Sequence, residues 1–139
     1  MAKAPLAPSL AELRAFLASE VPHCTAELLT ACDGSARMRQ PFDERQLRPG
    51  GTISGPVVMS LADVATYLAL LSRIGIVPLA VTSHLTISFL RRPKAERALL
   101  AEATFLKVGR KLAVAEVRIT SEGDHELAAH ATVTYAIPV

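Results

Sequence analysis

Apolar side chains follow a helical period at two places in the chain. Within residues 9–20 they recur every three or four positions, and Ser9 and Glu12 in front of them match a capping box. Within residues 56–74 they cover most of the helix circumference, with a proline at the first position and a glycine after the last. The pattern therefore predicts a short amphipathic helix and, later, a long buried helix.

Strand-like alternation of apolar and polar residues fills most of the rest. Two strands are predicted between residues 25 and 42, joined at Asp33-Gly34, a dipeptide suited to a tight hairpin. Four more follow the long helix, at 80–90, 98–108, 112–120 and 126–137. Because only short turns separate these four strands, we expect them to pair as an antiparallel meander. The order of elements predicts an α+β fold.

Length and composition indicate one folded domain over residues 1–139, with residues 1–8 flexible. Half of the residues are apolar (50%) and only 20% are charged, which excludes a disordered chain. The start resembles no signal peptide and no apolar run reaches transmembrane length, so we expect a cytoplasmic protein that binds no membrane. Cys24 and Cys32 are expected to be buried free thiols, with a disulfide between them as the alternative. The four histidines lack metal-ligand spacing, so no metal is expected.

Positive charge is concentrated in one part of the sequence. The net charge is only +2, but seven of the 15 Lys and Arg residues lie within 91–111: Arg91, Arg92, Lys94, Arg97, Lys107, Arg110 and Lys111. Such a group indicates a solvated face, a nucleic-acid surface or a site for a phosphorylated ligand. The chain has no Trp, two Tyr and four Phe and no recognition motif, which argues against nucleic acid. The other two readings stay level.

The segment 48–63, RPGGTISGPVVMSLAD, carries the candidate chemistry. It leads from a glycine-rich turn into the long helix, whose N-terminus offers unpaired N–H donors and partial positive charge to an oxyanion. Asp63 adds a base or a nucleophile within that helix. The turn lacks the Gly-Lys-Ser/Thr ending of a phosphate loop, and Ser54 lacks a Gly-x-Ser-x-Gly elbow. From these residues alone, a helix cap is the favoured reading of Gly55, and a surface or capping position is the favoured reading of Asp63.

The same segment resembles the hotdog-fold acyl-CoA thioesterases of the phenylacetic-acid-degradation and 4-hydroxybenzoyl-CoA type. In that family a curved antiparallel sheet wraps a central helix that a His-Gly-Gly triplet introduces, with Asp or Glu nine residues after the His. Here Ser54-Gly55-Pro56 stands at the triplet and Asp63 at that offset. Segments 85–93 and 108–110 resemble the family's later strand and turn, so the resemblance covers about residues 25–137. It implies a hotdog fold with an extra N-terminal helix.

The resemblance implies hydrolysis of an acyl-CoA thioester. Asp63 would act as base or nucleophile, the Gly55 N–H would polarise the carbonyl, and the Thr82 hydroxyl would help to hold the water. Coenzyme A would be part of the substrate, with no separate cofactor. Contacts to substrate or coenzyme A are assigned to Ser54, Arg48, Arg91, Arg92, Lys107, Gly109, Arg110 and Lys111. An apolar pocket for a medium-chain or aromatic acyl group is expected from Val58, Met59, Leu70 and Leu85.

Three departures from the family pattern favour an alternative. Ser54 replaces the family's His, Pro56 its second Gly, and Arg48 an Asn or Gln that often precedes the triplet. A non-catalytic hotdog module that binds acyl-CoA or acyl-carrier thioesters would tolerate these changes.

Helix geometry predicts that the active unit is a dimer. Eight residues separate Gly55 from Asp63, about 12 Å along the helix axis, so one thioester carbon cannot reach both. Two subunits with antiparallel central helices would bring Gly55 of one against Asp63 of the other. We therefore expect a homodimer with shared sites, and the resemblance implies assembly into a tetramer.

Overall fold

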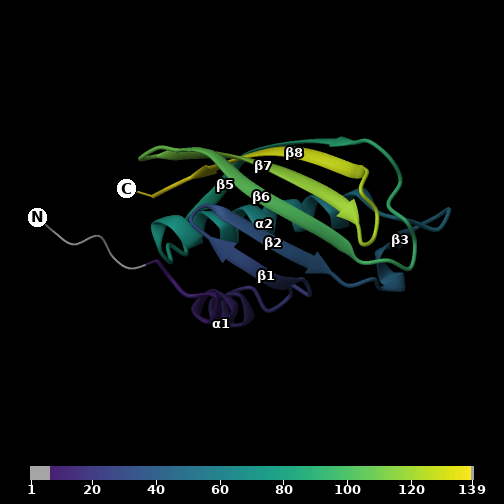
Figure 1. The fold of residues 1–139 in the computed structure, drawn as a ribbon, viewed down its shortest axis with the longest axis horizontal. Helices are drawn as coiled ribbons and strands as arrows, with labels where there is room; N and C mark the ends of the chain where they lie inside the picture. The colour runs from purple at the N-terminus through teal and green to yellow at the C-terminus, as the bar shows by residue number, and fades with distance from the viewer. Residues whose placement is uncertain (1–6, 139) are drawn as a thin grey trace, which may run out of the picture.

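Figure 1 shows the computed structural model, which describes residues 7–138. Of the residues 1–8 that are expected to be flexible, residues 1–6 lie outside this part. In chain order the elements are α1 (Leu10–Glu20), β1 (Glu27–Cys32), β2 (Ser35–Gln40), the 3-10 helix η1 (Glu44–Gln46), β3 (Leu47–Arg48), β4 (Thr52–Ile53), α2 (Gly55–Ile74), β5 (Val81–Phe89), β6 (Leu99–Val108), β7 (Leu112–Ser121) and β8 (Leu127–Ala136).

The sheet is antiparallel and its six strands follow the order β1-β2-β6-β7-β8-β5, with β3 and β4 as a separate two-stranded ribbon. The α+β class and the antiparallel sheet are confirmed. The expected meander of the last four strands is wrong for the first of them, because β5 pairs with β8 and lies at the sheet edge. Strand β6 instead pairs with β2, which closes the sheet around the helix. Short turns limited the direction of pairing, but they did not determine which neighbour each strand chooses.

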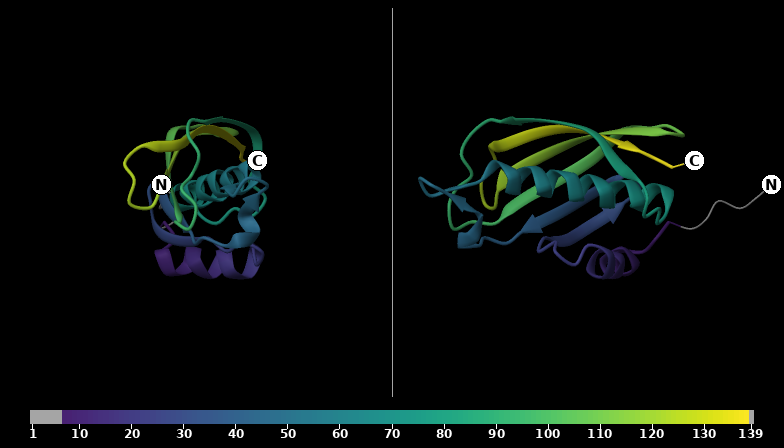
Figure 2. Two further views of the ribbon diagram at one scale, coloured as in Figure 1. Left: turned by 90° about the vertical axis from the view of Figure 1, so that its right-hand side faces the viewer. Right: turned by 180° about the vertical axis from the view of Figure 1, so that it is seen from behind.

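Helix α2 lies in the concave side of this curved sheet (Figure 2), and small side chains let it approach closely. The inward positions of the central strands are rich in fully buried alanines: Ala101 and Ala103 on β6, Ala113 and Ala115 on β7, Ala129 and Ala131 on β8. On the helix, Ala62, Ala65 and Ala69 are also fully buried. Leucines on its other inward positions fill the remaining space, as expected for a close-packed interior.

The short helix α1 closes the other edge of the sheet. Ser9 and Glu12 form the capping box that the sequence predicts. On the opposite side of the helix, Arg14 donates to the backbone oxygen of Leu28 at 3.0 Å and, more weakly, to that of Leu29 at 3.5 Å. These carbonyls belong to β1, so α1 covers one edge strand of the sheet and leaves β5 as the open edge.

Two further sequence predictions concern turns and cysteines. The hairpin at Asp33-Gly34 is confirmed, since both residues have positive φ (45° and 88°), as a tight two-residue turn requires. Cys24 and Cys32 are free, but the expected burial is wrong: Cys24 is half-buried and Cys32 is exposed beside the hairpin turn.

Helix α2 contradicts the expectation that no apolar run reaches transmembrane length. An 18-residue window of this 20-residue helix has a mean hydropathy of 1.6, so by length and composition alone the helix could span a bilayer. In the structure it is the helix around which the sheet curves, and its apolar residues face the strands.

Enlarging one small residue at the helix–sheet contact should destabilise the fold. Ala65→Leu adds three carbon atoms where no space is left, and we expect a loss of about 1–3 kcal/mol in the free energy of unfolding. Urea unfolding would measure it. The matched control is Ala15→Leu on the exposed side of α1, which should change stability by less than about 0.5 kcal/mol. Equal effects of the two variants would contradict close packing at the helix.

Candidate active site

Asp63 lies on the flank of α2 that the sheet leaves open, and two hydroxyl groups hold its side chain. The Thr82 hydroxyl donates to Asp63 Oδ1 at 2.5 Å, and the Tyr135 hydroxyl donates to the same oxygen at 2.9 Å. The Tyr135 hydroxyl also lies 3.2 Å from the backbone oxygen of Asp63. The predicted carboxylate therefore stands in a defined polar setting, half-buried and open to one side.

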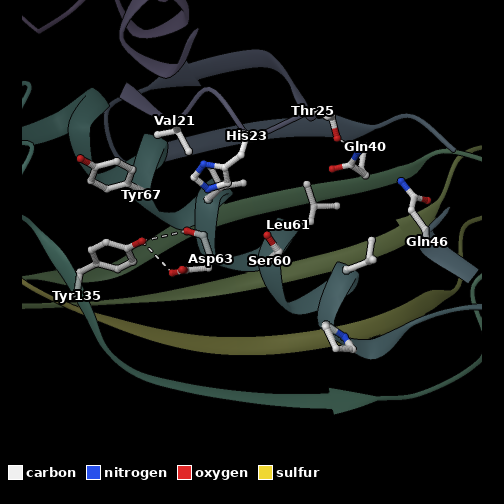
Figure 3. A pocket seen from close by; sticks show the side chains of 14 residues that line it. Val21, His23, Thr25, Gln40, Gln46, Ser60, Leu61, Asp63, Tyr67 and Tyr135 are labelled. Atoms are coloured by element: carbon white, nitrogen blue, oxygen red, sulfur yellow. Dashed lines mark hydrogen bonds between the residues drawn. The ribbon is translucent and has the colours of Figure 1, made fainter. Parts of the chain in front are cut away.

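A hollow of about 510 Å³ opens beside this carboxylate (Figure 3). One wall is the open flank of α2, where Val57, Leu61 and Val64 are apolar. The opposite wall comes from the loop after α1 and from the segment around β2, and it carries most of the polar groups: His23, Thr25, Gln40 and Gln46. Tyr67 and Tyr135 close the end next to Asp63. The hollow therefore has one mainly apolar wall and one mainly polar wall.

Gly55 is the first residue of α2. Within residues 7–138 its N–H has no hydrogen-bond partner, and the Ser54 side chain makes no capping bond. Pro56 has no N–H, and the next two N–H groups both bond to the Ser54 oxygen. A Cβ at Gly55 would lie 3.3 Å from Phe89 Cζ, so glycine also allows the aromatic ring to approach. The helix start therefore offers one free donor.

Gly55 and Asp63 do not share a hollow in one chain. Gly55 lines a second hollow of about 370 Å³, together with Phe89 and three of the predicted basic residues, Arg48, Arg91 and Arg92. Asp63 lines only the first. The helix separates the two predicted catalytic groups in the way the residue count implied.

The three arginines beside Gly55 differ in their pairing. Arg91 forms a close ion pair with Glu126 and lies 3.8 Å from Asp124. The Glu126 N–H, then Lys94 and Arg91, hold the pKa of Asp124 below its usual range. Arg48 and Arg92 are exposed and have no carboxylate within 4.0 Å among residues 7–138. Two of the three guanidinium groups are therefore available to an anion.

The remaining predicted basic residues lie at the other end of the molecule. Lys107 lies near the end of β6, and Arg110 and Lys111 lie with the predicted contact residue Gly109 in the β6–β7 turn, where the Ile137 N–H donates to the Lys111 oxygen. In Figure 1 this turn lies at the opposite end from β3 and the start of α2. The positive charges that cluster in the sequence are therefore divided, within one chain, between two ends of the molecule.

Sequence reasoning missed the tyrosines and misplaced most of the expected acyl pocket. Tyr135 is directly opposite Thr82 in the β5–β8 register, 72 residues from Asp63 along the chain. Its only sequence signal was an aromatic residue at an inward strand position. Of the residues expected to line an acyl pocket, Val58 borders the hollow of Gly55, Leu70 is buried in the core, and Met59 and Leu85 border neither hollow.

Comparison with known proteins places this geometry in a family. The model of the thioesterase superfamily matches residues 50–128, the segment from the glycine-rich turn through β7. The chain belongs to the thioesterase superfamily. The predicted resemblance is confirmed, and with it the hotdog fold.

Individual relatives agree with this assignment. The chain is similar to a proposed thioesterase of Silicibacter sp. TM1040, with 38% identity and a TM-score of 0.88 over 98% of this chain and 96% of the other. A proposed esterase of Halobacterium salinarum is 30% identical over 99 residues; these make up 68% of this chain and only 64% of that protein. A Streptococcus mutans UA159 protein solved with acetyl CoA has the same fold, with 22% identity and a TM-score of 0.74 over 81% of this chain and 88% of that one.

Proposed function

We propose that this protein is an acyl-CoA thioesterase, with Asp63 as base or nucleophile and the Gly55 N–H as oxyanion donor. The observation that carries the proposal is the placement of these two groups on α2. A carboxylate held by two hydroxyls faces an open hollow, and a free backbone donor stands at the N-terminus of the same helix. Membership of the thioesterase superfamily supports hydrolysis of a thioester.

The proposed chemistry divides between the two groups. In the first route Asp63 takes a proton from water, and the resulting hydroxide attacks the thioester carbon. In the second route the carboxylate attacks directly, and water later cleaves the mixed anhydride. In both routes negative charge develops on the carbonyl oxygen, where the Gly55 N–H and the helix dipole stabilise it by about 3 kcal/mol. In the first route the carbon–sulfur bond then breaks and the thiolate of coenzyme A takes the proton back from Asp63. In the second route this bond breaks as the mixed anhydride forms, and the thiolate takes a proton from water.

The two groups can act on one thioester only if two chains combine. The open edge strand β5 supports such a dimer, since its ladder groups are unpaired on one side and Val81 and Phe89 are more than half exposed. Thr82, near the start of β5, contacts Asp63, and Phe89, at its end, contacts Gly55. Antiparallel pairing of β5 with its copy would therefore bring Asp63 of one subunit toward Gly55 of the partner subunit.

The same pairing would unite the basic groups. Lys107 at the end of β6 and Arg110 and Lys111 in the following turn lie at the end of the sheet where β5 begins, whereas Arg48 and Arg92 lie where it ends. Two antiparallel subunits would bring the first group of one chain toward the second group of the other. Phosphates of coenzyme A are a fitting ligand for such a surface, and the acetyl CoA bound by the Streptococcus mutans relative supports this choice.

The hollow beside Asp63 suggests where the acyl group would bind. Its volume of about 510 Å³ and the apolar flank of α2 suit a medium-chain or aromatic acyl group. The proposal therefore assigns acyl recognition to Val57, Leu61 and Val64 in place of the residues expected from the sequence.

A non-catalytic module that binds acyl-CoA is the second candidate. It is favoured by the start of α2, where Pro56 supplies no N–H and Ser54 makes no capping bond, so that only one donor would face the oxyanion. Such a module would bind acyl-CoA without releasing thiol.

Asp63→Asn should abolish turnover, because it removes the proposed base or nucleophile while keeping the side-chain shape. We expect thiol release from medium-chain and aromatic acyl-CoAs to fall at least about a hundredfold. Glu102→Gln, on an exposed ion pair with Arg37, is the matched control and should keep native activity. Tight binding of acyl-CoA by the native protein with no thiol release across the panel would decide for the binding module.

Mixing two inactive variants should restore activity if the sites are shared. Gly55→Pro removes the N–H, and the extended backbone of Ser54 (ψ 149°) accepts a following proline. Refolded together in equal amounts, Gly55→Pro and Asp63→Asn chains would form mixed dimers with one intact site. We expect about a quarter of native activity, because half of the dimers would be mixed.

Gly55→Ala is the control for that experiment, since it crowds Phe89 equally but keeps the N–H. It should retain most of the activity. A mixture no more active than its separate components would refute shared sites.

Removing either unpaired arginine should weaken binding of coenzyme A. We expect Arg48→Ala and Arg92→Ala each to raise KM for acyl-CoA and the inhibition constant of free coenzyme A about tenfold, with little change in kcat. Arg91→Ala should do less, because Arg91 is already paired with Glu126. Arg37→Ala on the outer sheet face is the control. Equal effects of all four variants would show a general charge effect in place of a phosphate site.

A further inference from the structure

The two carboxylate oxygens of Asp63 stand in different surroundings. Oδ1 accepts hydrogen bonds from both Thr82 and Tyr135. Across the described chain, 7–138, no hydrogen bond reaches Oδ2. A carboxylate free to rotate would present either oxygen to a substrate. The Asp63 carboxylate is held through Oδ1, which leaves Oδ2 free.

Sheet register explains why both donors reach the same oxygen. Thr82 on β5 and Tyr135 on β8 are direct cross-strand partners, and both face α2. The sheet is irregular immediately after Thr82, where the register shifts before His84. The partner of Tyr135 on β7 is Ala113, whose small side chain leaves room for the ring. The two hydroxyls are thus placed side by side next to Asp63 of the helix.

The position of Tyr135 is set by an aromatic stack. Its ring is only 4% exposed and lies nearly parallel to that of Tyr67, with centroids 5.8 Å apart. The Tyr67 ring in turn packs against the ring of Phe16 on α1, with centroids 5.9 Å apart. The Tyr67 hydroxyl bonds the Pro78 oxygen and so does not compete for Asp63. Three of the six aromatic residues of the chain are used in this column.

Tyr135 also keeps its proton. Burial, and then the neighbouring negative charge of Asp63, raise the pKa of its phenol well above the ordinary value. The other titratable groups that border the hollow are His23, Cys24 and Tyr67. At the pH at which an enzyme of this kind would work, Tyr135 is therefore a hydrogen-bond donor and no candidate for a base.

We propose that Tyr135 is a positioning residue, which together with Thr82 holds Asp63 by Oδ1 and leaves Oδ2 as the oxygen that meets water or thioester. This inference rests on the proposed function. It changes the role expected for Thr82, whose hydroxyl is directed at the carboxylate and not left for the water. The benefit is orientation, because displacement of a reacting atom by about 1 Å can cost a hundredfold in rate.

Single and double removal of the hydroxyls tests the proposal. Tyr135→Phe keeps the ring and the stack, and Thr82→Val keeps the shape of the side chain. Each should lower kcat about tenfold to a hundredfold and leave KM within twofold, because the substrate does not depend on either hydroxyl for binding. The double variant should lose less than the product of the single losses, since both donors hold the same oxygen.

Thr66→Val is the matched control. Thr66 lies one turn further along α2, is fully buried, and donates only to the Ala62 oxygen. It should keep native kcat. Should Tyr135→Phe fail to fold, Thr82→Val carries the test alone, because Thr82 lies on the exposed edge strand.

The outcomes separate this inference from the proposed function. Unchanged kcat in Tyr135→Phe and Thr82→Val, with Asp63→Asn inactive, would overturn the positioning role and leave the thioesterase intact. A rise in KM alone would assign the hydroxyls to substrate binding and would also overturn it. Strictly multiplicative losses would refute a shared oxygen. A native protein without turnover would instead remove the proposed function, and the inference with it.

Discussion

The close approach of α2 to an alanine-rich sheet face is the constraint on which the rest of the structure depends. Fully buried alanines on β6, β7 and β8 face Ala62, Ala65 and Ala69, so the sheet packs closely against the helix. A charged side chain is tolerated only on the flank that the sheet leaves open, and there it needs hydrogen-bond donors. Asp63 occupies that flank, and Thr82 and Tyr135 supply the donors from the strands next to it. Packing thus determines where the carboxylate stands before any chemistry is considered.

A packed helix is also a rigid spacer, and its rigidity leads to the proposed dimer. The donor at Gly55 and the carboxylate at Asp63 stay about 12 Å apart along the axis whatever the loops do. They open into separate hollows of one chain. Arg14 of α1 bonds carbonyls of β1 at the second edge of the six-stranded sheet, so within residues 7–138 β5 is the edge strand of this sheet that is left open. In the proposed dimer, association would therefore use the edge beside the two functional groups.

Local patterns in the sequence predicted the elements well and their neighbours less well. The capping box, the tight hairpin and the helix from Gly55 to Ile74 follow from residues close together in the chain. The position of β5 beside β8 depends on contacts between distant strands, and the expected meander was accordingly wrong. The basic cluster within 91–111 looked like one surface, but the long strand β6 separates its two ends. Tyr135 was missed for the same reason, since its partner lies 72 residues away.

The parts of the site differ in whether they belong to the shared family segment. Gly55, Asp63 and Thr82 lie within residues 50–128, which match the superfamily model. Tyr135, which donates to the carboxylate, lies outside that segment, as do Phe16 at the end of the aromatic stack and His23, Gln40 and Gln46 on the far wall of the hollow. The groups proposed for bond cleavage are thus those that the family model includes. The groups that orient the carboxylate and border the proposed acyl pocket come from both parts: Thr82 and the apolar flank of α2 belong to the family segment, whereas Tyr135 and the polar wall do not. The loop after α1 and β8 should therefore contribute to substrate preference together with α2.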